Sequence, residues 1–523
     1  MKNKFFIISV ITLFLAFFIL LNWNSFSAPF ERDEGEYAYS AWLLRSGDTP
    51  YQDSFLQKPP LIIYTYLLGQ TLAPFAVWPP RVLAAIFIFL TSILVGLIAW
   101  KEWGKLTGVF SAFLFLPFVS FPPLAPFAAN TEKFMLLPMI ALVALFVFYK
   151  NSQKSWPYIL AGLFSTLAIF YKPICLPVIF FIIIFYLFKL YRSYEVPKIS
   201  LLIKPILLIG GTALVASIVL LIPFLKVWPS FFQEVFTFNV SYASNPANID
   251  ASSHNPLSNL IYFSAKFFHY WWVLLFLLFG LIFERPKNIF YYFILLLFSL
   301  LAIFSSPISH YYLILIPFLA LLCGALFNSL LESFSLSNRQ KIITTAIILP
   351  VILFIIIFPF KNQFSLSPQK LCEWIYGTVN PFGESEEVAK HLATVTKKND
   401  LVFVAGSEPQ IYYYAERKSA TRFVITYPLN LPTPFREQFQ RELVADLEKN
   451  PPEAIVLSQR VFSGLWSEGN PRIFIDYFTN LTSQKYKIMG GYVWDNNDVG
   501  HWQEPIDEKS IPSASLLLLT RNK

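Results

Sequence analysis

Long apolar runs, each near the length of a membrane-spanning helix, alternate with short polar segments along the first 360 residues. A helix needs about 20 apolar residues to cross the hydrocarbon core of a bilayer. The pattern therefore predicts a polytopic α-helical membrane protein with about eleven transmembrane helices. The predicted spans are residues 5–24, 80–99, 106–123, 131–149, 156–171, 173–191, 203–226, 266–283, 288–305, 310–331 and 341–360.

The first apolar run follows Lys2 and Lys4 and has some features of a signal peptide. Its apolar stretch of about 17 residues is longer than a usual signal-peptide core, and Asn22-Trp23 resembles an interfacial helix end. An uncleaved first span is therefore the favoured interpretation, with a cleaved signal as the alternative.

Basic residues between the runs predict the orientation. If the N-terminus is cytoplasmic, every loop on that side carries Lys or Arg, as cytoplasmic loops commonly do. These residues are Lys2, Lys4, Lys101, Lys105, Lys150, Lys154, Lys189, Arg192, Lys198, Arg285, Lys287, Arg339 and Lys341. Residues 25–79, residues 227–265 and everything after Lys361 are then predicted to be extracytoplasmic, in a multi-pass protein of the cell membrane.

The chain changes character after residue 361, where polar residues and prolines separate short apolar runs. Alternating helix and strand patterns there predict an α/β domain with a partly parallel sheet over residues 362–523, beside a membrane module of residues 1–361. Helices are expected at 383–399, 408–418, 436–450 and 472–482, and strands at 401–406, 422–427, 454–458 and 515–520.

Composition narrows the function classes. Only 14% of the 523 residues are charged and 55% are hydrophobic, whereas soluble domains carry roughly 25% charged residues. The net charge of +8 is explained by the loops, so no nucleic-acid partner is expected. The three cysteines show no disulfide or zinc spacing. The segment LVFVAGSEPQ has neither GxGxxG nor a Walker A motif, so a covering domain is favoured over a nucleotide site.

The densest mixed-charge segment, ERDEGEYAYSAWLLRSGDTPYQDSFLQKPPL, begins at residue 31 in the first predicted outer loop. A helix from Asp33 to Leu44 is expected, with Gly47 as its stop. A second helix is expected to begin near Pro59-Pro60, because proline is favoured in a first turn. Both helices are predicted to lie along the outer membrane surface.

The charges of this segment fit one kind of chemistry. A carboxylate such as Asp33 or Glu34 can take the proton from an attacking hydroxyl, and Lys58 can hold a departing phosphate. Transfer of a sugar from a polyprenyl phosphate to a hydroxyl acceptor needs both groups and no nucleotide pocket. The alternatives are structural: Asp33 and Glu36 match a capping box, and Lys58 could snorkel at the interface.

Two further motifs carry charge at predicted span ends. Glu132 opens the fourth span from the outside in PFAANTEKFMLLP, where Thr131-Glu132 could equally form a helix cap that favours the helix dipole. Lys172 in FYKPICLP is a second candidate phosphate ligand if it faces the bundle interior, and a snorkelling residue if it does not.

The stretch RDEGEYAYSAWLLRSGDTPYQDSFLQKPPL strongly resembles the first outer loop of GT-C glycosyltransferases, in the protein O-mannosyltransferase and lipid A aminoarabinose transferase superfamily. It is most similar to the bacterial RgtA/B/C/D-like branch. NTEKFMLLP resembles the second acidic motif of that branch, and SHYYLILIPFLALLCG, from Ser309, resembles a late helix. The resemblance covers roughly residues 1–360 and implies a GT-C fold.

The resemblance also implies roles and an inverting direct displacement. Asp33 would be the catalytic base, Glu34 would organise the site or a metal, and Lys58 would contact the donor phosphate. Glu132 would support the acceptor or the acidic cluster. His310 stands where many relatives have Arg, which leaves its phosphate role open.

Metal dependence stays open at this point. Asp33, Glu34 and Glu132 could share a hard divalent cation if they converge, and the five His give no zinc spacing. The sugar and the acceptor, which could be a lipid, a glycan or a protein, are not encoded in any motif. A lipid-linked-sugar transporter or flippase is the main alternative, although the chain shows no matching halves and its charges gather at the outer interface.

Overall fold

The computed structural model describes most of the chain. The described residues are 2–124, 126–150, 152, 154–193, 199–244, 286–303, 308–377, 380–460, 463–466, 468–495 and 499–522. The predicted span at 266–283 and residues 245–265 of the second outer loop lie outside them. The chain forms two compact units: unit 1 is Met1–Phe26, Arg81–Ile222 and Asn255–Leu366, and unit 2 is Ser27–Pro80, Pro223–His254 and Ser367–Lys523.

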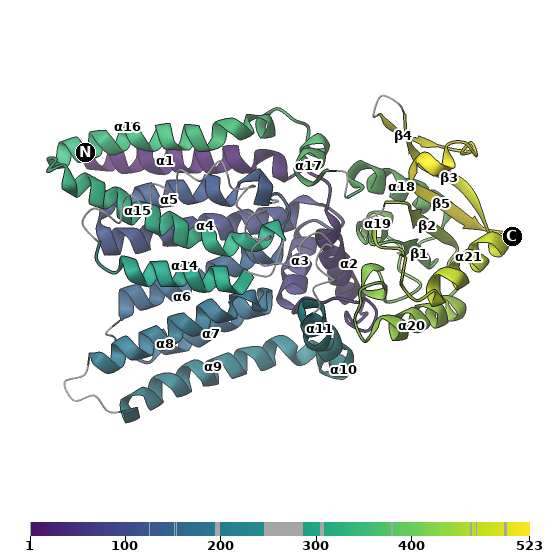
Figure 1. Cartoon of the computed structure of the whole chain (residues 1–523), viewed down its shortest axis with the longest axis horizontal. Helices are drawn as coiled ribbons and strands as arrows, with labels where there is room; N and C mark the ends of the chain where they lie inside the picture. Colours follow the sequence, from purple (N-terminus) through teal and green to yellow (C-terminus); the bar gives the residue numbers. More distant parts are fainter. Residues whose placement is uncertain are drawn as a thin grey trace. The chain divides into compact units, whose positions relative to one another are not determined.

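The helices of unit 1 match the predicted spans wherever the structure describes them (Figure 1). They are α1 (Lys2–Asn22), α4 (Trp78–Trp103), α5 (Lys105–Val119), α6 (Thr131–Tyr149), α7 (Trp156–Tyr171), α8 (Leu176–Arg192), α9 (Ile203–Leu221), α14 (Ile289–Ile303), α15 (Ile316–Ser333) and α16 (Asn338–Ile357). Within the described residues, seven helical segments are long and apolar enough to cross a membrane, and α5, α7 and α14 are shorter apolar helices.

Large apolar side chains point outward from these helices. Phe180 on α8, Leu207 on α9 and Phe354 on α16 are 65%, 67% and 63% exposed. Such surfaces are unfavourable in water and natural in lipid. The polytopic membrane class predicted from the sequence is therefore confirmed.

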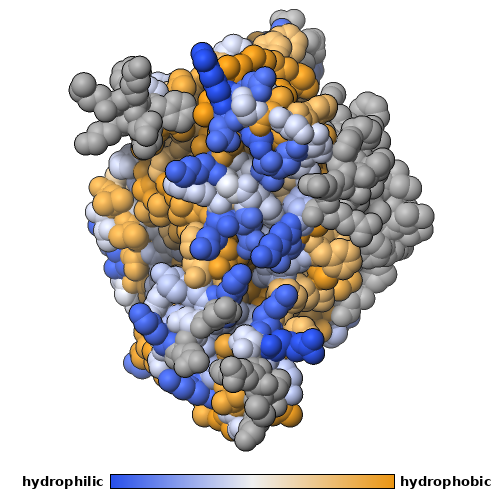
Figure 2. Space-filling model, turned by 90° about the vertical axis from the view of Figure 1, so that its left-hand side faces the viewer, coloured by the Kyte–Doolittle hydropathy of each residue, from blue (hydrophilic) through white to orange (hydrophobic). Residues whose placement is uncertain are grey.

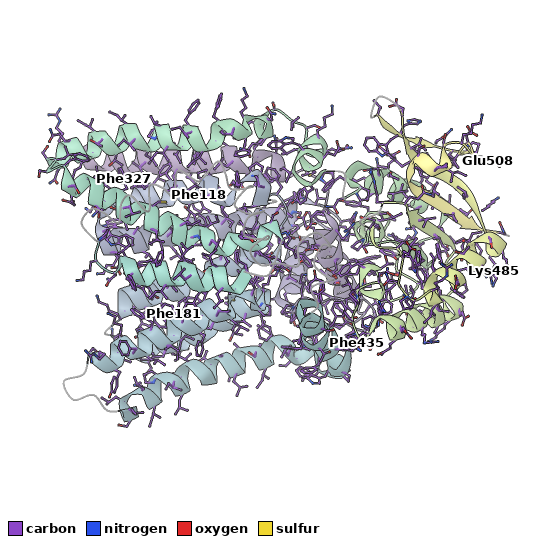
Figure 3. The ribbon with its side chains drawn as sticks, viewed as in Figure 1. Phe118, Phe181, Phe327, Phe435, Lys485 and Glu508 are labelled. Atoms are coloured by element: carbon purple, nitrogen blue, oxygen red, sulfur yellow. The ribbon has the colours of Figure 1, made fainter. Side chains whose placement is uncertain are left out.

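Inside unit 1, aromatic and small residues pack the helices together. The Phe110 and Phe327 rings stack with centroids 4.1 Å apart, joining α5 to α15, and Phe118, Phe181 and Phe327 mark this aromatic-rich part of the molecule in Figure 3. A Cβ on Gly108 would lie 2.7 Å from the carbonyl oxygen of Gly96, so α4 and α5 approach closely there.

Figure 1 places the start of α1 and the connection from α15 to α16 at the same end of unit 1. The sequence predicts that both segments are cytoplasmic, so they should lie at the same end of the helices. Figure 2 looks onto this side of the molecule, where hydrophilic residues gather in the middle of the face and hydrophobic residues border them. Which side of the membrane this end faces stays a prediction.

Unit 2 combines the two predicted outer segments with the C-terminal residues. Its helices are α2 (Arg32–Ser46), α3 (Leu61–Leu72), α10 (Trp228–Phe232), α11 (Asn239–Ser244), α17 (Pro368–Tyr376), α18 (Phe382–Val395), α19 (Gln410–Ala415), α20 (Arg436–Lys449) and α21 (Ile473–Lys485). The two short helices predicted in the first outer loop are thus confirmed, and Gly47 ends α2 with a φ of 90°. The functional division at residue 361 stays a prediction.

The sheet of unit 2 has the order β1-β2-β5-β3-β4. Its strands are β1 (Val402–Ala405), β2 (Ala454–Ser458), β3 (Tyr486–Trp494), β4 (Gly500–Gln503) and β5 (Ala514–Arg521). β1 and β2 are parallel and the other pairs antiparallel, which confirms a partly parallel sheet. β3 and β4 were not predicted, because Gly490 and Gly491 interrupt the apolar pattern of β3. Gly490 is needed there, since a Cβ on it would lie 2.6 Å from the Trp502 ring of β4.

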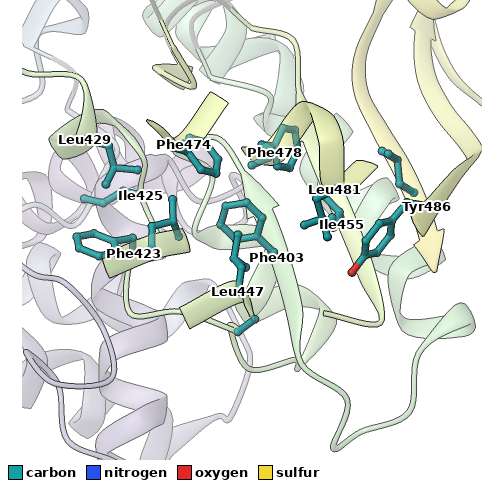
Figure 4. Close-up of a cluster of buried hydrophobic side chains, with 14 of the residues drawn as sticks. Phe403, Phe423, Ile425, Leu429, Leu447, Ile455, Phe474, Phe478, Leu481 and Tyr486 are labelled. Atoms are coloured by element: carbon teal, nitrogen blue, oxygen red, sulfur yellow. The ribbon is translucent and has the colours of Figure 1, made fainter. Parts of the chain in front are cut away.

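One face of the sheet is covered by α20 and α21 through a cluster of buried hydrophobic side chains (Figure 4). Phe403 from β1 packs with Phe474 and Phe478 of α21. Phe55 and Phe238, from the two outer segments, are buried in the same cluster. Both outer segments are therefore part of the core of unit 2.

The strand predicted at residues 422–427 is wrong. These residues form an irregular segment in which Phe423 and Ile425 are buried in the cluster of Figure 4. The Ser407 hydroxyl accepts hydrogen bonds from the backbone N–H groups of Thr426 and Tyr427, at 3.0 and 3.1 Å. A side chain thus satisfies backbone groups that a strand ladder would otherwise serve.

Candidate active site

The start of α2 shows how its carboxylates are divided. Glu31, not Asp33, is the N-cap residue, and it forms a capping box with Glu34. The Glu31 backbone N–H donates to Oε2 of Glu34 at 3.2 Å. The capping box considered for Asp33 with Glu36 is therefore wrong. Asp33 is half-buried, and its carboxylate makes no hydrogen bond or ion pair with any described residue.

The segment from Gly406 to Gln410 anchors α2 within unit 2. Arg32 pairs with the fully buried Glu408 at 2.9 Å and also donates to the Ser407 carbonyl. A Cβ on Gly35 would lie 2.5 Å from the backbone nitrogen of Gln410. Only glycine allows this approach of α2 to α19. The LVFVAGSEPQ stretch therefore positions α2, a role that sequence reasoning missed.

Glu36 is a second residue that sequence reasoning missed. It is 2% exposed, and its Oε1 has no hydrogen-bond partner among the described residues. Burial raises the pKa of Glu36 to about 8; the charge of Lys58 opposes this shift and that of Asp33 adds to it. Its position three residues after Asp33, on the same helix face, was the available signal. Asp33, Glu36 and Lys58 are called the α2 cluster below.

Lys58 is buried, and its backbone is fixed by its surroundings. It is 8% exposed, and the Tyr51 hydroxyl donates to its carbonyl oxygen at 2.9 Å. Two residues earlier, the Leu56 N–H donates to Oε2 of buried Glu234 at 2.7 Å. Hydrogen bonds thus fix the backbone of the loop that carries the Lys58 ammonium group.

An ionic network holds that loop to the rest of unit 2. Arg422 pairs with both Glu234 and Glu442, the latter through Nη2 and Oε2 at 3.0 Å. Its guanidinium lies 4.7 Å from the centroid of the Phe423 ring. These groups come from the second outer segment and the C-terminal region, and each has its partner. We assign them a structural role.

In unit 1, three predicted site residues from distant segments meet. Lys172, at the end of α7, forms an ion pair with Oε1 of Glu132 at the start of α6. Nε2 of His310 lies 3.6 Å from the same oxygen. Oε2 of Glu132 accepts a hydrogen bond from the Thr131 hydroxyl at 3.1 Å. Glu132, Lys172 and His310 are called the α6 cluster.

The α6 cluster is buried within the protein. Glu132 is 1% and Lys172 7% exposed, so Lys172 faces the interior of unit 1 and the snorkelling alternative is wrong. The Lys172 ammonium also lies 3.6 Å from the centroid of the Tyr311 ring. A carboxylate with an ammonium and an imidazole beside it is close to neutral overall, or positive if His310 is protonated.

Two of the carboxylates considered for a divalent metal are engaged in the described structure, and their binding of a metal stays a prediction. Glu34 is engaged in the capping box of α2, and Glu132 is engaged by Lys172. Among the described residues, no group of three His, Cys, Asp or Glu side chains could hold a metal ion.

Comparisons with known proteins establish the fold. The chain is similar to ArnT from Cupriavidus metallidurans bound to undecaprenyl phosphate, with 14% sequence identity and a TM-score of 0.59, over 92% of this chain and 96% of ArnT. Apo ArnT has 12% sequence identity and a TM-score of 0.59, over 99% of this chain and 98% of ArnT. For the Archaeoglobus fulgidus oligosaccharyltransferase AglB, in complex with an inhibitory peptide and a dolichol-phosphate, they are 12% and 0.50, over 97% and 76%.

No protein-family model matches the chain, and no curated protein matches it. The likeness to the solved structures extends over nearly the whole chain, and it confirms the predicted GT-C fold.

Proposed function

We propose that the protein is an integral membrane glycosyltransferase that moves a sugar from a polyprenyl-phosphate donor to a hydroxyl acceptor, inverting the anomeric carbon by direct displacement. The observation that carries the proposal is the unengaged Asp33 carboxylate in the same charged cluster as Lys58. The GT-C fold supports it, because ArnT with this fold binds undecaprenyl phosphate and AglB was captured with a dolichol-phosphate.

Each member of the α2 cluster has a separate task in this proposal. Asp33 accepts the proton of the attacking hydroxyl, because an ionised carboxylate has lone pairs that can take up this proton. Lys58 stabilises the charge that develops on the departing phosphate. Glu36, with a pKa near 8, is protonated at neutral pH and adds no second negative charge beside Asp33.

The α6 cluster presents an ammonium group in unit 1, and its net charge becomes positive when His310 is protonated. Glu132 holds the Lys172 ammonium in one place, and His310 adds charge when protonated. Such a preorganised cation suits a phosphate or pyrophosphate oxygen. We assign Lys172 and His310 to the lipid phosphate, and Glu132 to positioning them.

We further propose that the reaction occurs on the outer face of the cell membrane. The basic loops support this, because Lys and Arg are enriched in cytoplasmic loops and would put the N-terminus in the cytoplasm and the first outer segment outside. The donor tail then stays in lipid while the sugar is transferred at the interface.

A transfer assay in proteoliposomes tests the proposal. A panel of radiolabelled polyprenyl-phosphate sugars is offered with glycolipid, glycan and peptide acceptors to the wild type, Asp33→Asn and Glu34→Gln. Asp33→Asn should lose about 10²–10⁴-fold in rate with an unchanged melting temperature, as expected for a general base. Glu34→Gln is the matched control, since Gln can serve in a capping box.

Equal rates for Asp33→Asn and the wild type would remove Asp33 from catalysis. A wild type that transfers no sugar, but carries the labelled lipid across the bilayer, would show that the transporter interpretation is correct.

A further inference from the structure

Asn130, the residue before α6, has the right type and position for a helix cap but does not make one. It is the N-cap residue, with extended backbone angles, and its side chain forms no capping hydrogen bond. It is 2% exposed, and within the described residues neither Oδ1 nor Nδ2 has a hydrogen-bond partner. A buried amide with no partner at all is unusual.

Other helices of this chain show that it does form such caps. Ser337 accepts a hydrogen bond from the Gln340 N–H at the start of α16, and Ser367 accepts one from the Lys370 N–H at the start of α17. A buried polar group without a partner costs about 1–3 kcal/mol. Asn130 therefore lowers the stability of the fold instead of raising it, which points to a task other than capping.

The surroundings of Asn130 indicate what it binds. Glu132 of the α6 cluster follows two residues later, so the free amide lies at the same helix start as a buried ammonium and an imidazole. An uncharged amide offers two donors and one acceptor. These groups match a hydroxyl group, which both donates and accepts hydrogen bonds. They match an ionised phosphate less well, because it can only accept them.

We infer that Asn130 is a specificity residue that hydrogen-bonds a sugar hydroxyl beside the α6 cluster. The inference rests on the proposed glycosyltransferase function and adds that this helix start reads the sugar while the neighbouring cations hold the phosphate. The hydroxyl belongs either to the donor sugar or to a glycan acceptor, and the two sources predict different measurements.

The test measures binding and kinetics of the full chain in detergent or proteoliposomes. Affinities for polyprenyl phosphate alone and for polyprenyl-phosphate sugar are compared in the wild type, Asn130→Ala and Asn430→Ala. The last is the matched control, because Nδ2 of Asn430 donates to the carbonyl groups of Gly464 and Leu465. The wild-type measurements alone decide the proposed function, and the variants decide this inference.

Asn130→Ala should weaken binding of the sugar-bearing lipid about 3- to 10-fold, the worth of one hydrogen bond, and leave binding of the bare phosphate unchanged. Its melting temperature should stay the same or rise, whereas that of Asn430→Ala should fall. If the hydroxyl belongs to the acceptor, donor binding is unchanged and the acceptor KM rises instead.

Two results would overturn the inference. One is a lower melting temperature of Asn130→Ala together with equal losses for both lipids, which is the behaviour of a structural residue. The other is no change in donor affinity and none in acceptor KM. A wild type that neither binds nor transfers any polyprenyl-phosphate sugar would instead refute the proposed function.

Discussion

The starts of α2 and α6 both carry acidic side chains in their first turns, but they use them differently. At α2 the cap is complete, because Glu31 and Glu34 satisfy it, and Asp33 keeps an unengaged carboxylate. At α6 the Asn130 side chain makes no capping hydrogen bond, no described residue bonds its amide, and Glu132 is paired with Lys172. Among the described residues, one helix start thus leaves a carboxylate without a partner, and the other leaves a neutral amide without one.

The comparison shows that position on a helix does not determine the role of an acidic residue. Any carboxylate in a first turn gains from the helix dipole, so Asp33 and Glu132 look alike in sequence. Their roles are decided by partners: Glu31 and Glu34 occupy the cap at α2, while Lys172 and His310 reach Glu132 from other segments.

The largest expected effect is on the α6 side. Lys172→Met should destabilise the protein by about 3–5 kcal/mol, because it removes the ammonium partner of the buried Glu132 carboxylate. Thermal unfolding in detergent measures this. Lys341→Met is the control: it removes the pair with the exposed Glu332 and should cost no more than about 1 kcal/mol. Equal effects of the two changes would mean that the α6 pair is solvated.

A somewhat smaller effect is expected where α2 meets α19. Gly35→Ala should destabilise unit 2 by about 1–3 kcal/mol, because the new methyl group would meet the Gln410 backbone. The transfer rate should fall with it, since the helix that carries Asp33 must shift. Gly210→Ala, in α9 with open space around it, should be neutral or slightly stabilising. A stable, active Gly35→Ala protein would show that α2 does not need this close approach.

These contacts also show which features could be predicted from the sequence and which could not. The spans were predictable, because lipid demands an unbroken apolar length for each helix. The residues of the α6 cluster could be proposed one by one. Their meeting could not, because Lys172 and Glu132 are 40 positions apart and are joined only by helix packing.

At α2 the sequence predicted a capping box of Asp33 with Glu36, whereas the structure has one of Glu31 with Glu34. The start of α2 is held by Arg32, which pairs with Glu408, 376 positions further along the chain. Such long-range anchors leave no local pattern. The strand prediction at residues 422–427 failed for the same reason, since the distant Ser407 hydroxyl accepts the backbone hydrogen bonds that a strand partner would accept.

The next effect concerns the pH dependence of the α2 cluster. Because burial raises the pKa of Glu36 from 4.5 to about 8, the folded state holds a proton that the unfolded state releases between these values. Stability due to Glu36 is therefore fully present below about pH 4.5 and declines as pH rises towards 8, by up to about 1.4 kcal/mol per pH unit. Melting temperatures measured from pH 5 to 8 should show this slope.

Glu36→Gln should flatten that slope, because the amide keeps the shape of the protonated acid and does not titrate. Asp476→Asn is the control: its exposed carboxylate pairs with Arg472, which does not titrate in this range, so its removal should leave the slope from pH 5 to 8 in place. An unchanged slope in Glu36→Gln would assign the effect to another group.

The smallest expected effect tests most directly whether Glu34 is structural and Asp33 is not. Asp33→Ala should change the free energy of unfolding by no more than about 0.5 kcal/mol, because its carboxylate has no partner to lose among the described residues. Glu34→Ala should cost about 1 kcal/mol or more, since it breaks the capping box. Both are read from thermal unfolding at the same pH. If Asp33→Ala were the more destabilising change, Asp33 would be a structural residue, and the free carboxylate on which the proposed chemistry depends would not exist.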